Sequence, residues 1–336
     1  MPHSDLSLDA VHRARMRLEG ISRRTPLATS GALSRLTGAN VKLKLEGTQD
    51  TRSFKVRGAG NAIISLLEAG EVKRLVTYST GNHGRATTHI AAQLGLPVTV
   101  CVSSNTTDDK RSDLADLGAE VRVVGNTQDA AARAASALVD SDTALVDPID
   151  DPATTAGHAT IGLELLEDWP EVDTVVVPVS GGALIAGVAL AVKSAGRSVR
   201  VIGVSMDRGA AMHASLQAGR PVEVPEFESL ADSLQGGIGL DNTHTFRMVR
   251  ELVDDLILVS EDQIGLAMAL ALGEERLVLE GAGACPIAAM LAPSRPVLGD
   301  NVALIATGAM VGAEHLCRIA ARHSTGLAEL LGKAAV

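Results

Sequence analysis

The feature that most constrains this chain is its alternation of short apolar, β-branched runs with longer amphipathic segments. Such runs predict strands buried on both faces, and a helix after each strand predicts parallel sheets covered by helices. The predicted strands are residues 41–45, 74–80, 98–103, 119–125, 174–180, 199–205, 256–260 and 301–307. The predicted helices between them include residues 81–95, 108–118, 127–141 and 182–196. The pattern therefore predicts an α/β fold with doubly wound, mostly parallel sheets.

The stretch DPIDDPATTAG at residues 147–157 interrupts this alternation with prolines and aspartates. A break of this kind predicts two α/β lobes with a cleft between their sheets. Ligands of doubly wound folds bind beyond the carboxyl ends of the strands. The residues that follow the predicted strands are therefore the first candidates for a functional site.

Composition excludes several classes of partner. The formal net charge is −10, and the aromatic residues are one Trp, one Tyr and three Phe, so neither a basic stripe nor a base-stacking platform is available and no nucleic acid is expected. Cys101, Cys285 and Cys317 lie far apart, which fits neither a disulfide framework nor a zinc site and predicts a reducing, cytoplasmic location. No apolar run reaches membrane-spanning length without charges or glycines, so no membrane association is expected.

Three predicted strands end in turns of small and polar residues. STGNHG at 79–84 would expose backbone N–H groups at a helix N-terminus, which suits a carboxylate or phosphate, although a plain turn with a capping serine is the alternative. PVSGGALIAG at 178–187 could surround phosphate oxygens, but it lacks the spacing of a dinucleotide fingerprint and the lysine of a P-loop. IATGAM at 305–310 places Thr307 after a buried strand, where its hydroxyl needs a ligand or a backbone carbonyl as partner.

Lys55 gives these turns a common interpretation. It lies in TRSFKVRGAGNA at 51–62, before a glycine-rich helix start, and a solvated lysine is the ordinary reading. A cofactor with a phosphate, a ring hydroxyl, a ring nitrogen and an aldehyde would use the lysine and the three turns together. Pyridoxal phosphate is such a cofactor, and a lysine amine binds its aldehyde.

The segments SFKVRGAGNAI, STGNHG, VVVPVSGGALIAG and VEVPEFESLADSLQGGIG resemble the serine/threonine dehydratase group of fold-type II pyridoxal-phosphate enzymes across nearly the whole chain. The run from TIGLELLED to LADSLQGGIGLDNTHTF resembles most the hydroxyectoine-utilisation dehydratase subgroup. The resemblance implies a tryptophan synthase β-like fold with the cofactor in the interdomain cleft. Residues 1–48 and 147–336 would form a large cofactor-binding domain, and residues 49–146 a smaller, mobile domain carrying the substrate-carboxylate loop.

The resemblance also implies a role for each candidate residue. Lys55 would bind the pyridoxal 5'-phosphate aldehyde covalently and take the substrate Cα proton, and Phe54 would pack against the ring. Thr80 occupies the place of a catalytic serine in related racemases, although its hydroxyl could equally cap the helix. The remaining expected ligands are Ser180, Gly181, Gly182, Ala183 and Leu184 for the phosphate, Asn82 for the ring hydroxyl, Thr307 for the ring nitrogen, and Ser79, Gly81, Asn82 and His83 for the substrate carboxylate.

Four positions depart from the family pattern. Arg52 stands where a glycine usually precedes Ser-Phe-Lys, so it either reshapes the turn or adds a cation, and a solvated arginine is the favoured reading. Ala183 replaces the last glycine of the phosphate loop, a modest change if its φ is negative. TGAM replaces the usual Ser-Gly-Gly-Asn around Thr307. Ser205 stands where serine racemases carry a metal-binding glutamate, so no metal is expected.

The implied reaction is β-elimination of water from a 3-hydroxy amino acid, giving a 2-oxo acid or imine and ammonia. The subgroup places this lyase in hydroxyectoine catabolism, with 3-hydroxy-2,4-diaminobutyrate as a candidate substrate and a homodimer as the expected assembly. Threonine, serine and 3-hydroxyaspartate stay open as substrates, and an amino-acid racemase stays open as an activity. Outside this family, a nicotinamide oxidoreductase would leave Lys55 unexplained, and a binding protein that kept the fold without the reaction is disfavoured by Lys55.

Overall fold

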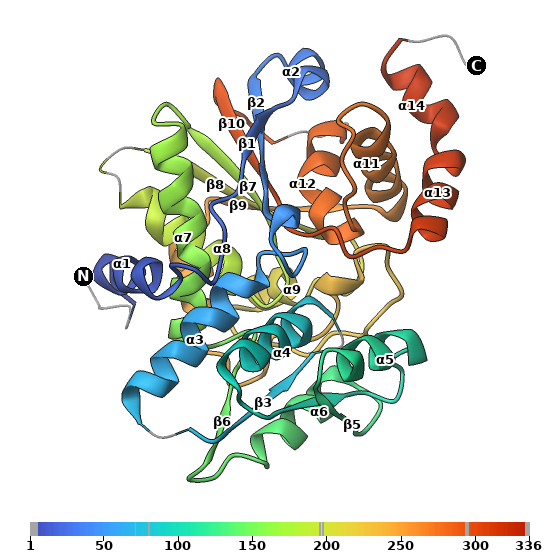
Figure 1. The fold of residues 1–336 in the computed structure, drawn as a ribbon. Coiled ribbons are helices and arrows are strands. Elements are labelled where there is room, and N and C mark those ends of the chain that lie inside the picture. Colours follow the sequence, from blue (N-terminus) through green and yellow to red (C-terminus); the bar gives the residue numbers. More distant parts are fainter. Residues whose placement is uncertain are drawn as a thin grey trace.

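The computed structural model describes residues 6–70, 72–79, 81–194, 196, 198–292 and 296–332. It contains two mostly parallel sheets with helices on their faces (Figure 1). One sheet has six strands in the order β1-β2-β10-β7-β8-β9, and the other has four in the order β5-β4-β3-β6. The predicted α/β class with parallel sheets is confirmed.

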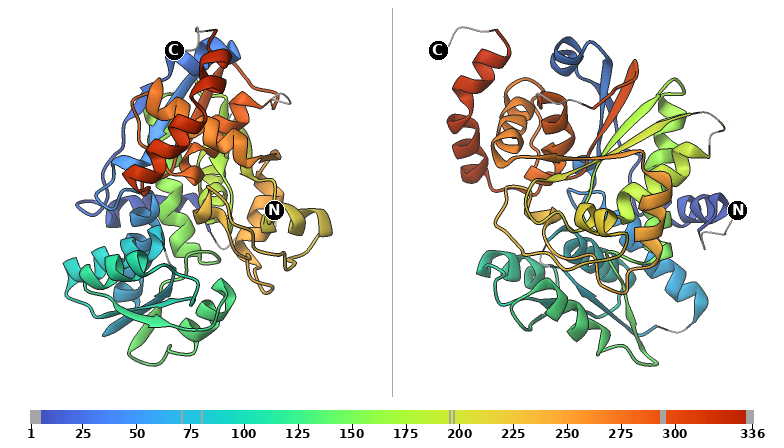
Figure 2. Two further views of the ribbon diagram at one scale, coloured as in Figure 1. Left: turned by 90° about the vertical axis from the view of Figure 1, so that its right-hand side faces the viewer. Right: turned by 180° about the vertical axis from the view of Figure 1, so that it is seen from behind.

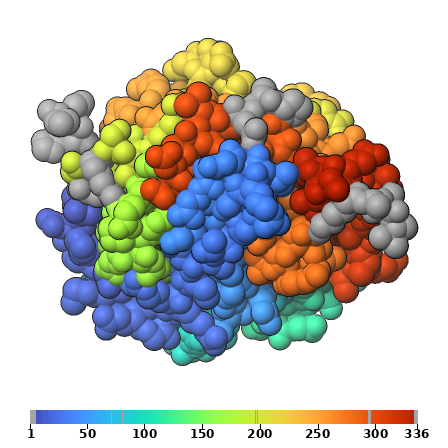
Figure 3. Space-filling model, turned by 90° about the horizontal axis from the view of Figure 1, so that it is seen from above, coloured from blue at the N-terminus to red at the C-terminus, as the bar shows by residue number. Residues whose placement is uncertain are grey.

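The six-stranded sheet is built from both ends of the chain. Its strands are β1 Leu27–Thr29, β2 Asn40–Leu45, β7 Thr174–Pro178, β8 Arg200–Met206, β9 Asp255–Val259 and β10 Asn301–Ala306. Only β1 in this sheet is antiparallel to its neighbour. Viewed from above, the blue N-terminal segment lies beside the red-orange segment that contains β10, as expected from the parallel pairing of β2 with β10 (Figure 3).

Helices cover both faces of this sheet, and the strand sequences explain why. In β7, Val176 joins one apolar cluster, while its neighbours Val175 and Val177 join the cluster on the opposite face, as the alternation of side chains along a strand requires. The first cluster includes residues of α2 Gly31–Thr37, α11 Glu261–Gly273, α12 Gly281–Leu291 and α13 Ala313–Arg322. The second includes residues of α1 Leu8–Arg17, α7 Pro152–Asp168, α8 Ala183–Lys193, α9 Ala211–Ala218 and α10 His244–Leu252.

The four-stranded sheet lies below the larger sheet in Figure 1, and Figure 2 shows the same separation from the side and from behind. Its strands are β3 Arg74–Tyr78, β4 Val98–Val102, β5 Glu120–Val123 and β6 Thr143–Leu145, all paired in parallel. Its helices are α3 Lys55–Ala69, α4 Asn82–Leu94, α5 Asp108–Asp116 and α6 Gln128–Ser136. All four strands fall within the predicted 49–146 domain, whose boundaries and mobility stay predictions.

Most differences from the predicted elements lie at strand ends. The strands predicted to end at residues 80, 180 and 307 end at Tyr78, Pro178 and Ala306, so the candidate residues beyond them lie in turns. The helix predicted over 127–141 ends at Ser136. The three-residue strands β1 and β6 were not predicted, because so few residues show no periodicity. In the described ranges, no helix is long and apolar enough to cross a bilayer.

Candidate active site

The lysine segment and the Thr-Gly-Ala-Met turn, 252 residues apart at Lys55 and Thr307, lie directly against each other. Ser53 and Gly308 form an isolated antiparallel bridge. The Phe54 N–H donates to the Thr307 carbonyl at 3.0 Å, and the Ala309 N–H donates to the Arg52 carbonyl at 3.0 Å. The structure thus unites two motifs that the sequence singled out separately, and it places Lys55 at the first position of α3.

Arg52 adopts the left-handed backbone conformation, which a glycine adopts readily. Its φ is 62°, a region that non-glycine residues rarely occupy. The side chain is exposed, which agrees with the favoured reading of a solvated arginine. Arg52 therefore places local backbone strain three residues before Lys55.

Lys55 is held in an environment that favours its neutral amine. Burial lowers the pKa of Lys55 to about 8, even though the nearby carboxylates of Asp147 and Glu280 act in the opposite direction. The Lys55 Nζ lies 5.1 Å from the centroid of the Phe54 ring. An amine with a pKa near neutrality is suited to covalent and proton-transfer chemistry, which an ordinary surface lysine is not.

The predicted carboxylate-binding turn, residues 79–84, leads from β3 into α4. Gly81 is the N-cap of α4, and Asn82 and His83 are its first two residues, both buried. The Gly81 N–H donates to the Ser79 Oγ at 3.2 Å. The turn thus presents the positive end of a helix dipole, a suitable site for an anion. Thr80, the second predicted catalytic residue, lies outside the described residues.

His83 is a neutral imidazole. Its Nε2 lies 3.2 Å from the Val146 carbonyl, so this nitrogen carries the proton and Nδ1 is the acceptor. Burial, with the positive charge of Lys55 as a second cause, lowers the pKa of His83 to about 3. The buried Nδ1 has no hydrogen-bond partner among the described residues.

The predicted phosphate turn, residues 180–184, leads from β7 into α8 and has the backbone form that an anion site needs. Gly182 is the N-cap of α8 with a φ of 99°, and a Cβ there would lie 2.8 Å from the Met212 Cε. At Gly181 a Cβ would lie 2.7 Å from Ile149, so both glycines are required by close packing. Ala183 does not have a positive φ, which satisfies the condition for its replacing a glycine.

Ser180, Leu184 and Thr307 complete the predicted cofactor set. Ser180 is half-buried between β7 and α8, Leu184 is buried in the first turn of α8, and Thr307 is 2% exposed directly after β10. The Thr307 hydroxyl makes no hydrogen bond to another described residue, so it is available to a ligand atom.

Two carboxylates near Lys55, the buried Glu280 and the half-buried Asp147, were missed by the sequence analysis. Burial raises the pKa of Glu280 to about 8 and also raises the pKa of Asp147. Asp147 accepts a hydrogen bond from the Tyr78 hydroxyl at 3.1 Å, and Glu280 accepts one from the Asn82 Nδ2 at 2.8 Å. Asp147 lies in the stretch read only as a domain break, and Glu280 opens the glycine-rich segment EGAGA at 280–284, which gave the available sequence signal.

His158, on α7, is a third residue that the sequence analysis missed. It is fully buried, its ring lies 4.7 Å from the Phe54 ring, and it occupies the space that a side chain at Gly58 would need. Burial, followed by the charge of Lys55, lowers the pKa of His158 well below its usual value. Neither ring nitrogen has a partner among the described residues. His158 is thus a neutral ring that packs against the Phe54 ring.

A buried ion cluster fixes the helix that carries Lys55. Arg57, two residues after Lys55 on α3, donates from Nε to Glu46 at 2.8 Å and from Nη1 to Glu164 at 2.6 Å. Lys44 pairs with the same Glu164 at 2.7 Å. Burial alone would raise the pKa of Glu164, but the hydrogen bonds and positive charges of Arg57 and Lys44 bring it below its usual value. The Glu164 carboxylate is therefore ionised. The cluster joins α3 to α7 and to the end of β2.

These residues fit pyridoxal phosphate. The amine of Lys55 is matched to the aldehyde, the N-terminus of α8 to the phosphate, and the free Thr307 hydroxyl to the ring nitrogen. The buried Asn82 Oδ1 has no partner among the described residues, and a buried carbonyl oxygen of this kind calls for a donor. When bound, this cofactor would supply an electron-withdrawing group joined to the substrate α-nitrogen, which would make the Cα proton more acidic.

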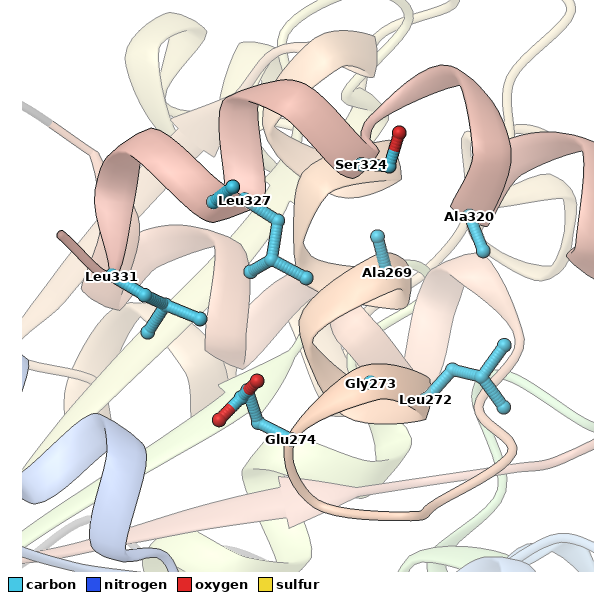
Figure 4. A pocket seen from close by; sticks show the side chains of 9 residues that line it. Ala269, Leu272, Gly273, Glu274, Ala320, Ser324, Leu327 and Leu331 are labelled. Atoms are coloured by element: carbon cyan, nitrogen blue, oxygen red, sulfur yellow. The ribbon is translucent and has the colours of Figure 1, made fainter. Parts of the chain in front are cut away.

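An apolar pocket of about 280 Å³ lies away from these residues, between α11, α13 and α14 Ser324–Leu330 (Figure 4). Its walls include Ala269, Leu272, Leu327 and Leu331. None of the candidate residues lines it. The pocket is therefore separate from the candidate active site.

Comparisons with known proteins identify the same cofactor. The family model described as pyridoxal-phosphate dependent enzyme matches residues 18–308. A protein of Sinorhizobium fredii is 47% identical over 306 residues, which cover 91% of this chain and 92% of the relative. The L-threonine ammonia-lyase of Thermotoga maritima is 38% identical, over 94% of this chain and 78% of its own. The catabolic L-threonine dehydratase of Escherichia coli is 37% identical, over 85% and 87%.

Solved structures give the same fold. Maize serine racemase matches with a TM-score of 0.87 and 29% identity, over 96% of this chain and 99% of its own. A T.th. threonine deaminase matches with a TM-score of 0.80 and 33% identity, over 91% and 99%. The predicted fold-type II architecture and the predicted cofactor are thereby confirmed. The chain belongs to the pyridoxal-phosphate dependent enzymes, as a threonine dehydratase-like lyase.

Proposed function

We propose that this enzyme removes water from a 3-hydroxy amino acid and releases a 2-oxo acid, or an imine, and ammonia. The observation that carries the proposal is the Lys55 amine, whose pKa burial lowers to about 8 and whose charge acts on His83 in the first turn of α4. The names of the relatives, threonine dehydratase and threonine ammonia-lyase, support the same reaction class. The residues of the candidate site then have separate roles in this reaction.

The substrate carboxylate binds at the carboxylate-binding turn, where Ser79, Gly81, Asn82 and His83 surround the N-terminus of α4. The neutral Lys55 amine takes the proton from the substrate Cα. Thr307 offers a neutral hydroxyl to the ring nitrogen, which leaves that nitrogen without a proton and favours loss of the hydroxyl group over transamination. Thr80 remains a candidate for the acid on the other face.

We propose 3-hydroxy-2,4-diaminobutyrate, formed after ring opening in hydroxyectoine catabolism, as the substrate. Intact hydroxyectoine is excluded chemically, because its α-nitrogen is locked in a delocalised amidine ring and cannot react with an aldehyde. The acidic groups beside Lys55 support a second ammonium group on the substrate: Asp147 and Glu280 both act on Lys55 through their charge, burial raises the pKa of each, and Asp147 Oδ2 has no hydrogen bond to another described residue. An ammonium would stabilise these groups as carboxylates.

The second candidate substrate is 3-hydroxyaspartate, and Arg52 is the observation that favours it. A second carboxylate would pair with a cation, and the exposed Arg52 guanidinium has no ion-pair partner among the described residues. The same carboxylate would be repelled by Asp147 if it entered the cleft more deeply. Threonine and serine carry neither charge and are the uncharged reference substrates, while racemisation of any of these is the alternative activity.

The test is a substrate panel with the purified holoenzyme. Ammonia and 2-oxo acid release are measured with L-serine, L-threonine, both 3-hydroxyaspartate diastereomers, 3-hydroxy-2,4-diaminobutyrate and intact hydroxyectoine, and Lys55→Ala is the control. We expect Lys55-dependent release with the highest kcat/KM for the diamino acid. Turnover of intact hydroxyectoine would refute the ring-opening argument, and stereoinversion without ammonia release would make the enzyme a racemase.

We also propose that the chain forms a homodimer and that residues 49–146 move as one unit when substrate binds. Light scattering of the purified holoenzyme measures the assembly directly, and a mass of one chain would contradict it. The proposed movement follows from the arrangement of the carboxylate-binding turn on the small sheet and the phosphate turn on the large one.

A further inference from the structure

Glu280 joins two parts of the active site that are far apart in the chain. It is the N-cap of α12, is 4% exposed, and its backbone N–H donates to the Gly308 carbonyl at 3.1 Å. One carboxylate oxygen, Oε1, accepts from the Asn82 Nδ2 at 2.8 Å. The other, Oε2, accepts from the Met310 N–H at 3.2 Å. A single side chain thus bonds the start of α4 to the turn that follows Thr307.

Gly308 explains how the carboxylate reaches this position. A Cβ at Gly308 would lie 2.5 Å from the Glu280 Oε1, closer than real Cβ contacts come. The glycine therefore lets the carboxylate lie against the backbone of the turn. Gly312, four residues later, has nothing within 4 Å of such a Cβ. The two glycines form a matched pair, in which one supports Glu280 and the other does not.

The bond to Glu280 determines how the Asn82 amide is oriented. Because Nδ2 is directed to the carboxylate, Oδ1 lies on the other edge of the planar amide and points away from Glu280. There the Oδ1 is buried and has no partner among the described residues, in a side chain that is 6% exposed. Burying an acceptor without a donor is unfavourable, and a bound ligand can supply that donor.

We infer that Glu280 is a positioning residue that fixes the Asn82 amide, so that its oxygen faces the bound cofactor, while tying the carboxylate-binding turn to the Thr307 turn. Glu280 itself need not touch the cofactor. Its effect on cofactor binding passes through Asn82, and this dependence separates a positioning role from a general contribution to folding.

The test is a double-mutant cycle on cofactor affinity, which requires no substrate. Apoprotein is titrated with pyridoxal 5'-phosphate, and the visible absorbance of the bound cofactor gives both Kd and the position of the absorption band. We expect Glu280→Gln and Asn82→Ala each to raise Kd about tenfold and to shift the band, because glutamine cannot accept both hydrogen bonds. The double variant should bind no more weakly than Asn82→Ala alone.

Gly308→Ala provides a second route that leaves the Glu280 side chain itself unchanged. Its Cβ should displace the carboxylate and raise Kd in wild-type protein but not in the Asn82→Ala background, while Gly312→Ala should leave Kd unchanged. Additive effects of Glu280→Gln and Asn82→Ala, or an unchanged Kd in either single variant, would overturn the inference. Normal cofactor binding with no turnover of any substrate would instead count against the proposed function, so the two can fail separately.

Discussion

At the scale of single residues, the chemistry depends on the proton of Lys55. An exposed lysine is protonated at neutral pH, whereas burial lowers the pKa of Lys55 to about 8. The carboxylates of Asp147 and Glu280 oppose this shift. The balance between burial and these two charges therefore sets the pH at which the amine can react.

We predict that the rate at which apoprotein incorporates pyridoxal phosphate rises with pH and levels off above about 8, because the neutral amine is the nucleophile and its fraction grows as pH passes the pKa. The absorbance of the bound cofactor, followed by stopped flow between pH 6.5 and 10, measures this rate as roughly tenfold per pH unit on the rising limb. Asp147→Asn should move the midpoint to lower pH by removing a negative charge. A midpoint above 9 in wild-type protein would contradict the assignment.

Arg52 leads to a second prediction. A non-glycine residue with a φ of 62° costs about 1 kcal/mol relative to glycine, so Arg52→Gly should raise the free energy of unfolding of the apoprotein by up to this amount. Urea unfolding measures it, with Arg276→Gly, at a φ of 60°, as the matched case remote from Lys55. If kcat/KM for 3-hydroxyaspartate falls in Arg52→Gly while that for threonine does not, Arg52 contacts the second carboxylate. A less stable Arg52→Gly protein would show that the strain is absent.

The sequence predicted residues whose neighbours in the chain carry the signal. Lys55, Asn82 and the glycines of the phosphate turn stand in motifs with recognisable local chemistry, and the structure places them at helix starts or in the turn that leads into a helix. Glu280 and Asp147 could not be predicted in this way. An acidic residue has the same appearance in a sequence whether it is solvated or buried, and the partners of Glu280 lie 198 and 30 residues away.

At the scale of elements, α3 is held by charges as well as by apolar contacts. Arg57 is 1% exposed and its guanidinium bonds both Glu46 and Glu164, which belong to different elements. Removing one member of such a cluster leaves a buried charge without its partner, which is more destabilising than removing an exposed ion pair. Glu46, which follows β2, and Glu164, on α7, therefore hold the first turn of α3, which carries Lys55.

We predict that Arg57→Met lowers the free energy of unfolding by about 4 kcal/mol, because Glu46 and Glu164 would then repel each other in a buried site. Arg15→Met removes an exposed pair with Glu167 and should change it by less than about 1 kcal/mol. Urea denaturation of the two apoproteins compares them directly. Equal losses in the two variants would mean that the cluster at Arg57 contributes no more than a surface ion pair.

Element prediction succeeded where the periodicity was long. The β-branched run predicts β7, because residues at alternate positions of this strand pack into two apolar clusters on opposite faces of the sheet. The repeating apolar pattern predicts α8. The ends of β3, β7 and β10 were placed one or two residues too late, since the polar residues that follow have no signal that distinguishes the last paired residue from the first turn residue. Those turn residues are the candidate ligands, so the functional positions coincide with the least predictable boundaries.

At the scale of the whole molecule, the candidate site draws on both sheets. The carboxylate-binding turn follows β3 of the small sheet, whereas the phosphate turn and Thr307 follow β7 and β10 of the large sheet. The lysine segment contacts the large sheet through the bridge between Ser53 and Gly308, although α3 packs against the small sheet. A ligand that touches all of these groups must therefore reduce the freedom of the two sheets relative to each other.

We predict that pyridoxal phosphate slows backbone hydrogen exchange in segments of both sheets, because binding to the folded state stabilises it against local opening. Mass spectrometry of apoprotein and holoenzyme should show slower exchange at 53–58, 79–84, 180–184 and 305–310, and no change in α14, which lines only the remote pocket. Lys55→Ala should lose most of this protection, since the covalent bond is absent. Protection confined to the large sheet would place the cofactor away from the carboxylate-binding turn. That result would contradict a single site that draws on both sheets, even if each turn has the described geometry.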